Sequence, residues 1–280
     1  DKHITGNYES KREVLKLLCK WKNGTLSNTY AIGLEGNPGT GKTTFVKHAF
    51  SEATGLPLVY IGLGGCQDSS FLLGSSYTYE GSMYGRLVGG LIETQCCNPI
   101  FFFDELDKVS SSPKGDEIIN VLIHLIDVSQ NSHIRDKYFN FDIDFSKCIF
   151  VFSYNDPQRI SPVLLDRIKR IRVETPNSEE KLKIMTSNII PKYLNNNSVK
   201  FEEDALKFIL KKNEEQVGLR SIEKDIEHVT SCFNLYKTYG SASILGLKEV
   251  IGNKKCITLE FVKELLKKKS EYSHVSMMYL

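Results

Sequence analysis

The sequence has no strong charge of either sign, no metal-binding cysteine spacing and no long apolar run. Its 280 residues carry a net charge of +2, so no strong field attracts nucleic acid or an anionic membrane. No apolar run approaches the roughly 20 residues that a membrane-spanning helix needs. We therefore expect no membrane partner, and nucleic acid is disfavoured as a partner.

The seven cysteines are scattered along the chain and include no C-x-x-C pair. An odd number of cysteines at irregular positions favours reduced thiols over disulfides. We also read no secretory signal peptide at the N-terminus. These features predict an intracellular reducing compartment, in the first place the cytoplasm, with the mitochondrial matrix as the alternative.

A glycine-rich segment, "GNPGTGKTT" at residues 36–44, fits the pattern G-x-x-x-x-G-K-[ST]. Glycines let backbone N–H groups converge on phosphate oxygens, and the helix that follows favours anions at its N-terminus. Lys42 is expected to contact the β- and γ-phosphates, and the Thr43 hydroxyl to ligate Mg²⁺. The predicted nucleotide-binding set is Gly36, Asn37, Pro38, Gly39, Thr40, Gly41, Lys42, Thr43 and Thr44.

The context of this loop agrees with a nucleotide site. An apolar run ending at Gly36 precedes it, and a helical pattern that stops at Gly55 follows it. A second buried strand, "PIFFF", ends in Asp104 and Glu105, and the carboxyl ends of parallel strands are where ligands bind. We expect Asp104 to hold the Mg²⁺ shell and Glu105 to orient or deprotonate the attacking water.

Further candidates follow along the chain. Asn155 ends a third apolar strand, within reach of the γ-phosphate or the water, and Arg220 lies near the start of an amphipathic helix. The segment "SPVLLDRIKRIRVETP" between a short helix and a fifth strand offers three arginines, namely Arg167, Arg170 and Arg172.

Taken together, these segments resemble an AAA+ ATPase, and more narrowly the ATPase module of Lon-type proteases. The broad resemblance rests on the phosphate loop, Asp104 with Glu105, and the positions of Asn155, Arg167 and Arg220. The narrower resemblance rests on the sequences of several segments that follow one another in the family's order. Among them are "YIGLGGCQD", "YTYEGSMYGRLVGGL", "KCIFVFSYND", "PVLLDRIKRIRV" and "VGLRSIEKDI".

The resemblance implies an enzyme that hydrolyses ATP with Mg²⁺ in a homo-oligomeric, six-membered ring that threads a polypeptide substrate through its pore. Lys42, Glu105, Asn155 and Arg167 are then the catalytic set. Arg167 from one subunit would act on the next subunit's γ-phosphate, with Arg170 as the fallback, because a trans-acting arginine neutralises charge on the phosphoryl group. Arg220 would sense nucleotide from the lid and couple its state to the lid angle.

One loop departs from the Lon pattern. Tyr79 falls on the aromatic position of the first pore loop, but Glu80 replaces its apolar partner. A ring would place one Glu80 per subunit around a narrow channel, where like charges raise each other's pKa or recruit cations. We therefore predict a weakened grip, or a bias toward basic segments of the substrate.

We predict an α/β fold in which residues 1–175 form a P-loop domain with a five-stranded parallel sheet flanked by helices, and residues 176–280 form a small, mainly helical lid. The expected strands are Tyr30–Leu34, Leu58–Ile61, Ile100–Phe103, Cys148–Phe152 and Ile171–Val173. Asn177 with Glu180 reads as a capping box at the start of the lid. The stretch 239–259 reads as a loop or hairpin turning at Gly252–Asn253.

Two other functions compete with the Lon-type reading. One is a DNA-handling AAA+ motor or loader, against which the near-neutral charge weighs. The other is an ATP-binding assembly scaffold with little hydrolysis, which Thr5 (at the position of the family's adenine-contacting tyrosine) and Glu80 leave open. No serine–lysine dyad follows the lid, so we expect no peptidase activity from this chain alone and expect it to be an excised part of a larger protein.

Overall fold

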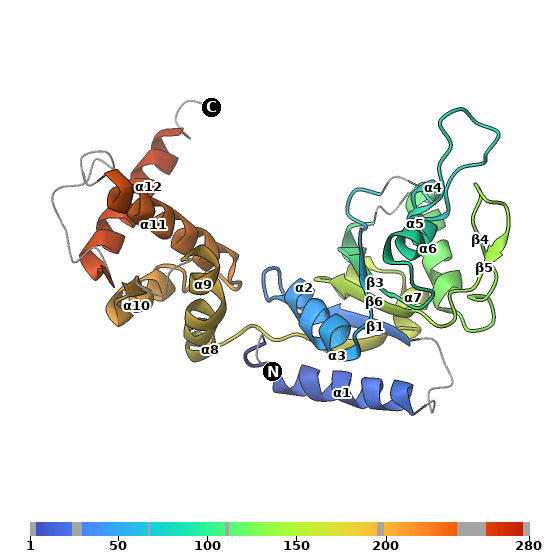
Figure 1. The fold of residues 1–280 in the computed structure, drawn as a ribbon, viewed down its shortest axis with the longest axis horizontal. Coiled ribbons are helices and arrows are strands. Elements are labelled where there is room, and N and C mark those ends of the chain that lie inside the picture. The colour runs from blue at the N-terminus through green and yellow to red at the C-terminus, as the bar shows by residue number, and fades with distance from the viewer. Residues whose placement is uncertain are drawn as a thin grey trace. The chain divides into compact units, whose positions relative to one another are not determined.

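The computed structural model describes residues 4–23, 30–66, 68–109, 112–194, 199–239 and 256–276. The chain divides into two compact units, one of Asn7–Glu174 and one of Asp1–Gly6 with Thr175–Leu280. Figure 1 shows the elements of both units, which are described separately below.

The first unit contains the predicted parallel sheet. Its strands are ordered β2-β3-β6-β1-β7, and every neighbouring pair is parallel. The α/β fold class predicted from the sequence is therefore confirmed. The five strands are β1 (Tyr30–Glu35), β2 (Leu58–Gly62), β3 (Ile100–Asp104), β6 (Ile149–Tyr154) and β7 (Lys169–Arg172).

Helices lie on both sides of this sheet, α5 and α6 on one side and α2 and α3 on the other (Figure 1). The chain from Lys42 to Thr54 is helical throughout, with a wider π-type segment in the middle, and it stops at Gly55, whose φ is +73°. The remaining elements of this unit are α1 (Tyr8–Lys22), α2 (Lys42–Phe45), η1 (Val46–Ser51), α3 (Glu52–Thr54), α4 (Ser70–Leu73), α5 (Arg86–Thr94), η2 (Leu106–Lys108), α6 (Pro113–Ile126), β4 (Ile134–Arg135), β5 (Asp142–Ile143), η3 (Pro157–Arg159) and α7 (Pro162–Asp166).

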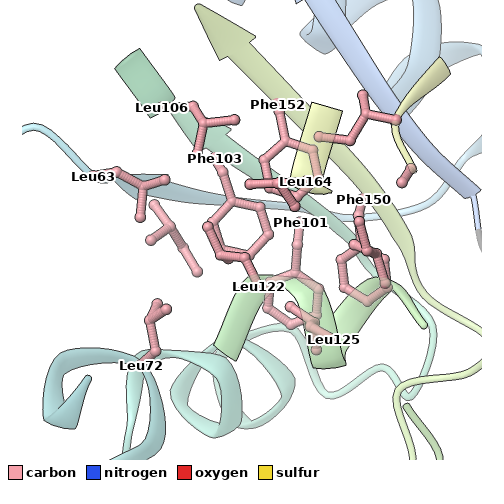
Figure 2. Close-up of a cluster of buried hydrophobic side chains, with 14 of the residues drawn as sticks. Leu63, Leu72, Phe101, Phe103, Leu106, Leu122, Leu125, Phe150, Phe152 and Leu164 are labelled. Carbon is pink, nitrogen blue, oxygen red and sulfur yellow. The ribbon is translucent and has the colours of Figure 1, made fainter. Parts of the chain in front are cut away.

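The core of the first unit is rich in phenylalanine. Phe103 and Phe152 stack with ring centroids 5.0 Å apart, and Phe101 and Phe150 stack at 6.0 Å. Leucines from the flanking helices close around these rings (Figure 2). Because side chains alternate along a strand, Phe102 faces the other side of the sheet. The same alternation puts Tyr60, Asp104 and Ser153 on the side of Phe102.

The second unit has its own apolar core and is mainly helical. Asn177 and Glu180 form the expected capping box, since Asn177 Oδ1 accepts from the Glu180 N–H at 2.8 Å and Glu180 Oε2 accepts from the Asn177 N–H at 3.0 Å. The predicted turn at 252–253 lies outside the described residues. The elements of this unit are α8 (Ser178–Ile184), η4 (Met185–Ile189), α9 (Ile190–Tyr193), β8 (Lys200–Phe201), α10 (Glu203–Lys212), α11 (Arg220–Tyr239), β9 (Cys256–Ile257) and α12 (Leu259–Ser276), with β8 and β9 paired in parallel.

Candidate nucleotide site

The glycine loop follows the carboxyl end of β1 and opens the helix α2. The Gly36 N–H donates to the Tyr154 carbonyl at 3.3 Å, which ties the start of the loop to the end of β6. Gly39 and Gly41 have φ values of +75° and +88°, a region that residues with a Cβ rarely adopt. A Cβ built on Gly41 would meet nothing within 4 Å, so the glycine there is explained by the backbone conformation and not by crowding.

Lys42 lies at the first turn of α2 and points back over the loop. Its Nζ donates to the Gly36 carbonyl at 2.6 Å, to the Asn37 carbonyl at 3.1 Å and to Asn155 Oδ1 at 2.7 Å. Asn155 follows β6 directly, 113 residues further along the chain. The structure therefore brings together two of the residues singled out from the sequence.

Asp104, at the end of β3, is held by three donors. Its Oδ2 accepts from the Tyr60 hydroxyl at 2.9 Å, and its Oδ1 accepts from the Glu105 N–H at 3.1 Å and from the Ser153 hydroxyl. Because β3 and β6 are neighbours, Asp104 and Asn155 end adjacent strands. A carboxylate and the lysine–asparagine pair thus lie at one edge of the sheet.

Glu105 follows Asp104 and adopts φ +60°, which is uncommon for a residue with a side chain. Its side chain is exposed, and a Cβ added to Gly64 would lie 2.3 Å from Glu105 Oε2. The carboxylate therefore occupies space that the missing side chain of Gly64 leaves open.

The residues at this edge fit a nucleotide with Mg²⁺. No group of three or more His, Cys, Asp or Glu side chains suited to a metal ion occurs among the described residues. Mg²⁺ is commonly held by one or two carboxylates together with substrate phosphates, and Asp104 offers such a carboxylate. Thr43 and Thr44 are exposed in the first turn of α2, where a hydroxyl is accessible to an incoming ligand. Thr40 is buried, and its hydroxyl donates to the Asn37 carbonyl at 2.9 Å, so it braces the loop.

The candidate arginines lie on or next to other elements. Arg167 follows α7 and is exposed, and its Nη1 donates to Asp127 Oδ2. Arg170 and Arg172 are exposed on β7. Arg220, also exposed, is the first residue of α11 in the second unit, so its role rests on the sequence alone.

The loop between α4 and α5 presents Tyr79 with 71% of its surface exposed, next to an exposed Glu80. The Ser82 N–H donates to the Tyr79 carbonyl at 3.2 Å, and Gly81 has φ +78°. This turn presents both side chains to solvent at the tip of the loop.

Four residues with structural roles at the site were missed from the sequence: Tyr60, Gly64, Asp127 and Ser153. Strand alternation places Tyr60 and Ser153 on the face of Asp104 only once the strand order and register are known. Asp127 follows α6, and its contact with Arg167 leaves no local signal in the sequence.

A strand, a glycine loop, a helix and an acidic strand end in the same parallel sheet together define a P-loop nucleotide-binding fold. Residues 32–176, more than half of the 280-residue chain, match the model of the AAA family, described as the ATPase family associated with various cellular activities. The chain belongs to this family, which implies nucleotide binding.

The chain is also similar to Lon proteases. It is 35% identical over 243 residues to "Lon protease homolog" of Acanthamoeba polyphaga mimivirus, covering 84% of this chain and 24% of the relative. It is 34% identical over 241 residues to "Lon protease" of Clostridioides difficile (84% of this chain, 30% of the relative), and 39% identical over 196 residues to "Lon protease" of Helicobacter pylori (68% and 23%). The chain thus spans 23% to 30% of the length of these relatives, and its likeness to Lon lies in an AAA+ module. No helix among the described residues has the length and apolar character needed to cross a bilayer.

Proposed function

We propose that this chain hydrolyses ATP as a Lon-type AAA+ module and couples the hydrolysis to the unfolding and translocation of a polypeptide, within a ring of identical subunits. The observation that carries the proposal is the convergence of Lys42, Asn155 and Asp104 at one sheet edge, with Lys42 Nζ 2.7 Å from Asn155 Oδ1. Family membership and the similarity to Lon proteases support it.

Each residue has a proposed task in hydrolysis. The backbone N–H groups of the loop 36–44 bind the phosphates, and Lys42 leaves its carbonyl and amide partners to contact the β- and γ-phosphates. Thr43 and Asp104 hold Mg²⁺, which when bound neutralises charge on the phosphates. Glu105 accepts the proton of the water that adds to the γ-phosphorus as the bond to ADP breaks, and Asn155 orients that water.

Arg167 and Arg220 are proposed to complete the site from other parts of the assembly. Arg167 of one subunit contacts the γ-phosphate in the next, in the manner of an arginine finger. Residues 1–175 act as the nucleotide-binding domain and residues 176–280 as the lid, whose Arg220 links the nucleotide state to the lid angle. Tyr79 contacts the polypeptide in the pore.

The first test compares ATP hydrolysis of the chain alone, with an unfolded protein and with DNA. Stimulation by the unfolded protein is expected, and stimulation by DNA alone would favour a DNA-handling motor instead. Glu105→Gln should abolish hydrolysis while retaining ATP binding. If the parent hydrolyses ATP no faster than Glu105→Gln does, Glu105 contributes no catalysis, and the chain would instead be an ATP-binding scaffold.

The second test examines the ring. Arg167→Ala and Glu105→Gln should each be inactive alone. Mixed in equal amounts, they should regain about a quarter of the parent rate, because random mixing joins an intact Glu105 to a neighbour's intact Arg167 at about one interface in four. A mixture as inactive as its components would show that Arg167 does not act across a subunit interface.

A further inference from the structure

Tyr60 lies on β2, outside the glycine loop and the acidic strand end, yet its side chain reaches the site. Tyr60 is paired with Phe102 in the sheet, and Gly62 is paired with Asp104. Tyr60 and Asp104 are therefore diagonal neighbours on one face, a spacing that aromatic side chains can bridge.

The Tyr60 ring lies against Gly62 on this diagonal path. A Cβ built on Gly62 would lie in ordinary van der Waals contact with the Tyr60 phenol, 3.7 Å and 3.8 Å from two of its atoms, so the ring packs next to this glycine. The ring also contacts Phe102 edge to face, with centroids 5.7 Å apart. These contacts orient the phenol so that its hydroxyl donates to Asp104 Oδ2 at 2.9 Å.

The opposite side of the carboxylate is held from β6. Ser153 is buried, and its hydroxyl donates to Asp104 Oδ1, to which the Glu105 N–H also donates at 3.1 Å. An ionised carboxylate has about four acceptor positions. Three donors thus fix the plane of the carboxylate and leave an acceptor position for a hydrated cation.

We propose that Tyr60 is a positioning residue for the Mg²⁺ site: with Ser153, it holds the carboxylate of Asp104 in the orientation that Mg²⁺ requires. The proposal rests on the function proposed above, in which Asp104 is a magnesium-binding residue. Groups that hydrogen-bond to a metal ligand set its orientation, and their loss typically weakens metal binding about 10- to 100-fold. Tyr60 is half exposed, so its hydroxyl can be removed without opening the core.

The test measures metal affinity directly. The full chain is saturated with a non-hydrolysable ATP analogue, and Mn²⁺ binding is followed by electron paramagnetic resonance. Tyr60→Phe and Ser153→Ala should each raise the half-saturating Mn²⁺ concentration about tenfold. Affinity for the analogue in EDTA should stay within about twofold of the parent, because neither hydroxyl is proposed to contact the nucleotide. If the two hydroxyls only stabilised the fold, their removal would not lower the Mn²⁺ affinity while leaving the metal-free nucleotide affinity unchanged.

The matched control is Tyr154→Phe, which removes a phenol hydroxyl from β6 that makes no hydrogen bond in the described part of the chain. Its Mn²⁺ curve should match that of the parent. Gly62→Val is a second variant that keeps the Tyr60 hydroxyl. A Cβ alone would fit beside the ring, but the two γ-methyl groups of valine should displace it, so this variant should weaken Mn²⁺ binding as Tyr60→Phe does.

An unchanged or tighter Mn²⁺ curve for Tyr60→Phe, with normal binding by the parent, would overturn the positioning role and leave the proposed function standing. An equal loss of metal-free nucleotide affinity would also overturn it. A parent chain that binds neither the nucleotide nor Mn²⁺ would overturn both proposals.

Discussion

Arg167 donates a hydrogen bond from Nη1 to Oδ2 of Asp127, forty residues earlier in the chain. Asp127 also accepts from the Ser129 hydroxyl at 2.7 Å and from the Ser129 N–H at 2.9 Å. The Ser129 hydroxyl first, and then Arg167, lower the pKa of Asp127 to about 2. A carboxylate with a lowered pKa stabilises the fold above its unfolded pKa of about 3.9, and this contribution is lost as the pH falls to about 2. Asp127 is therefore charged at neutral pH and orients the arginine proposed to act across the subunit interface.

Asp127→Asn should lower the kcat of ATP hydrolysis about three- to tenfold with little change in KM, because the guanidinium loses part of its fixed orientation. The stability of the fold should change by less than about 1 kcal/mol, since a partly exposed ion pair contributes little. Glu93→Gln is the control, because it removes the partner of Arg86 in an ion pair on α5. A variant as fast as the parent, or faster, would mean that Asp127 does not assist Arg167.

Gly64→Ala tests the position of Glu105. The added Cβ would lie 2.3 Å from Glu105 Oε2, the flexible end of a side chain, so the carboxylate should move while the fold remains intact. We expect kcat to fall about 10- to 100-fold, because a displacement of about 1 Å has costs of this order. ATP affinity, measured with a fluorescent nucleotide, should be unchanged.

The neighbouring glycine provides the control. A Cβ on Gly65 would meet nothing within 4 Å, so Gly65→Ala should retain the parent rate. Equal rates for Gly64→Ala and the parent would show that Glu105 tolerates displacement and is not the base in hydrolysis.

Much of the sheet could be predicted from the sequence because its strands are short apolar runs with polar ends. The strand predicted at Ile100–Phe103 is observed at Ile100–Asp104, and the helix after the glycine loop ends at Gly55 as predicted. Local chemistry determines these features. The strand near 148–152 is shifted, to Ile149–Tyr154, since an apolar run does not mark the residue at which sheet pairing stops.

The contacts between distant side chains could not be predicted in the same way. The bond between Tyr60 and Asp104 depends on the register of β2 against β3, and an apolar strand does not encode its register. The contact between Arg167 and Asp127 depends on the conformation of the loops that follow α6 and α7. The sequence therefore indicated candidate residues at the ends of strands but not the side chains that contact them.

Tyr154 carries a buried hydroxyl for which no partner lies within the described part of the chain. Burial first, and then the nearby Glu35 carboxylate, raise the pKa of Tyr154 to about 12. Tyr154→Phe should increase the free energy of unfolding by about 1 kcal/mol near neutral pH, because a buried polar group without a hydrogen bond costs free energy. Urea titration measures this change, with the exposed Tyr8→Phe as the control.

The parent and Tyr154→Phe should also differ in how their stability changes at high pH. Because the pKa of Tyr154 is raised, the parent has no alkaline loss from this group below the unfolded tyrosine pKa of about 10, and it loses stability as the pH rises from there to about 12. Tyr154→Phe should lack this part of the alkaline loss. If the variant is less stable than the parent near neutral pH, the hydroxyl has a hydrogen-bond partner after all.

In the proposed ring, Glu80 would influence how the loop between α4 and α5 contacts a substrate. It is exposed beside Tyr79, and in a ring several such carboxylates would line the pore. An apolar polypeptide segment would have to pass these charges, whereas a basic segment would be attracted to them. Glu80→Ile should therefore increase the stimulation of ATP hydrolysis by an unfolded protein about two- to fivefold, with the basal rate unchanged.

Two polypeptide substrates of equal length, one rich in lysine and one neutral, distinguish a generally weakened grip on the polypeptide from a preference for basic segments. The parent should be stimulated more by the lysine-rich chain, particularly at low salt, because exposed charges are screened as the ionic strength rises. Glu80→Ile should lose this preference, while Glu80→Asp should keep it because the charge is retained. Equal stimulation of the parent and Glu80→Ile by both substrates at low salt would mean that Glu80 does not face the polypeptide and that Tyr79, on the same turn, is not part of the pore surface.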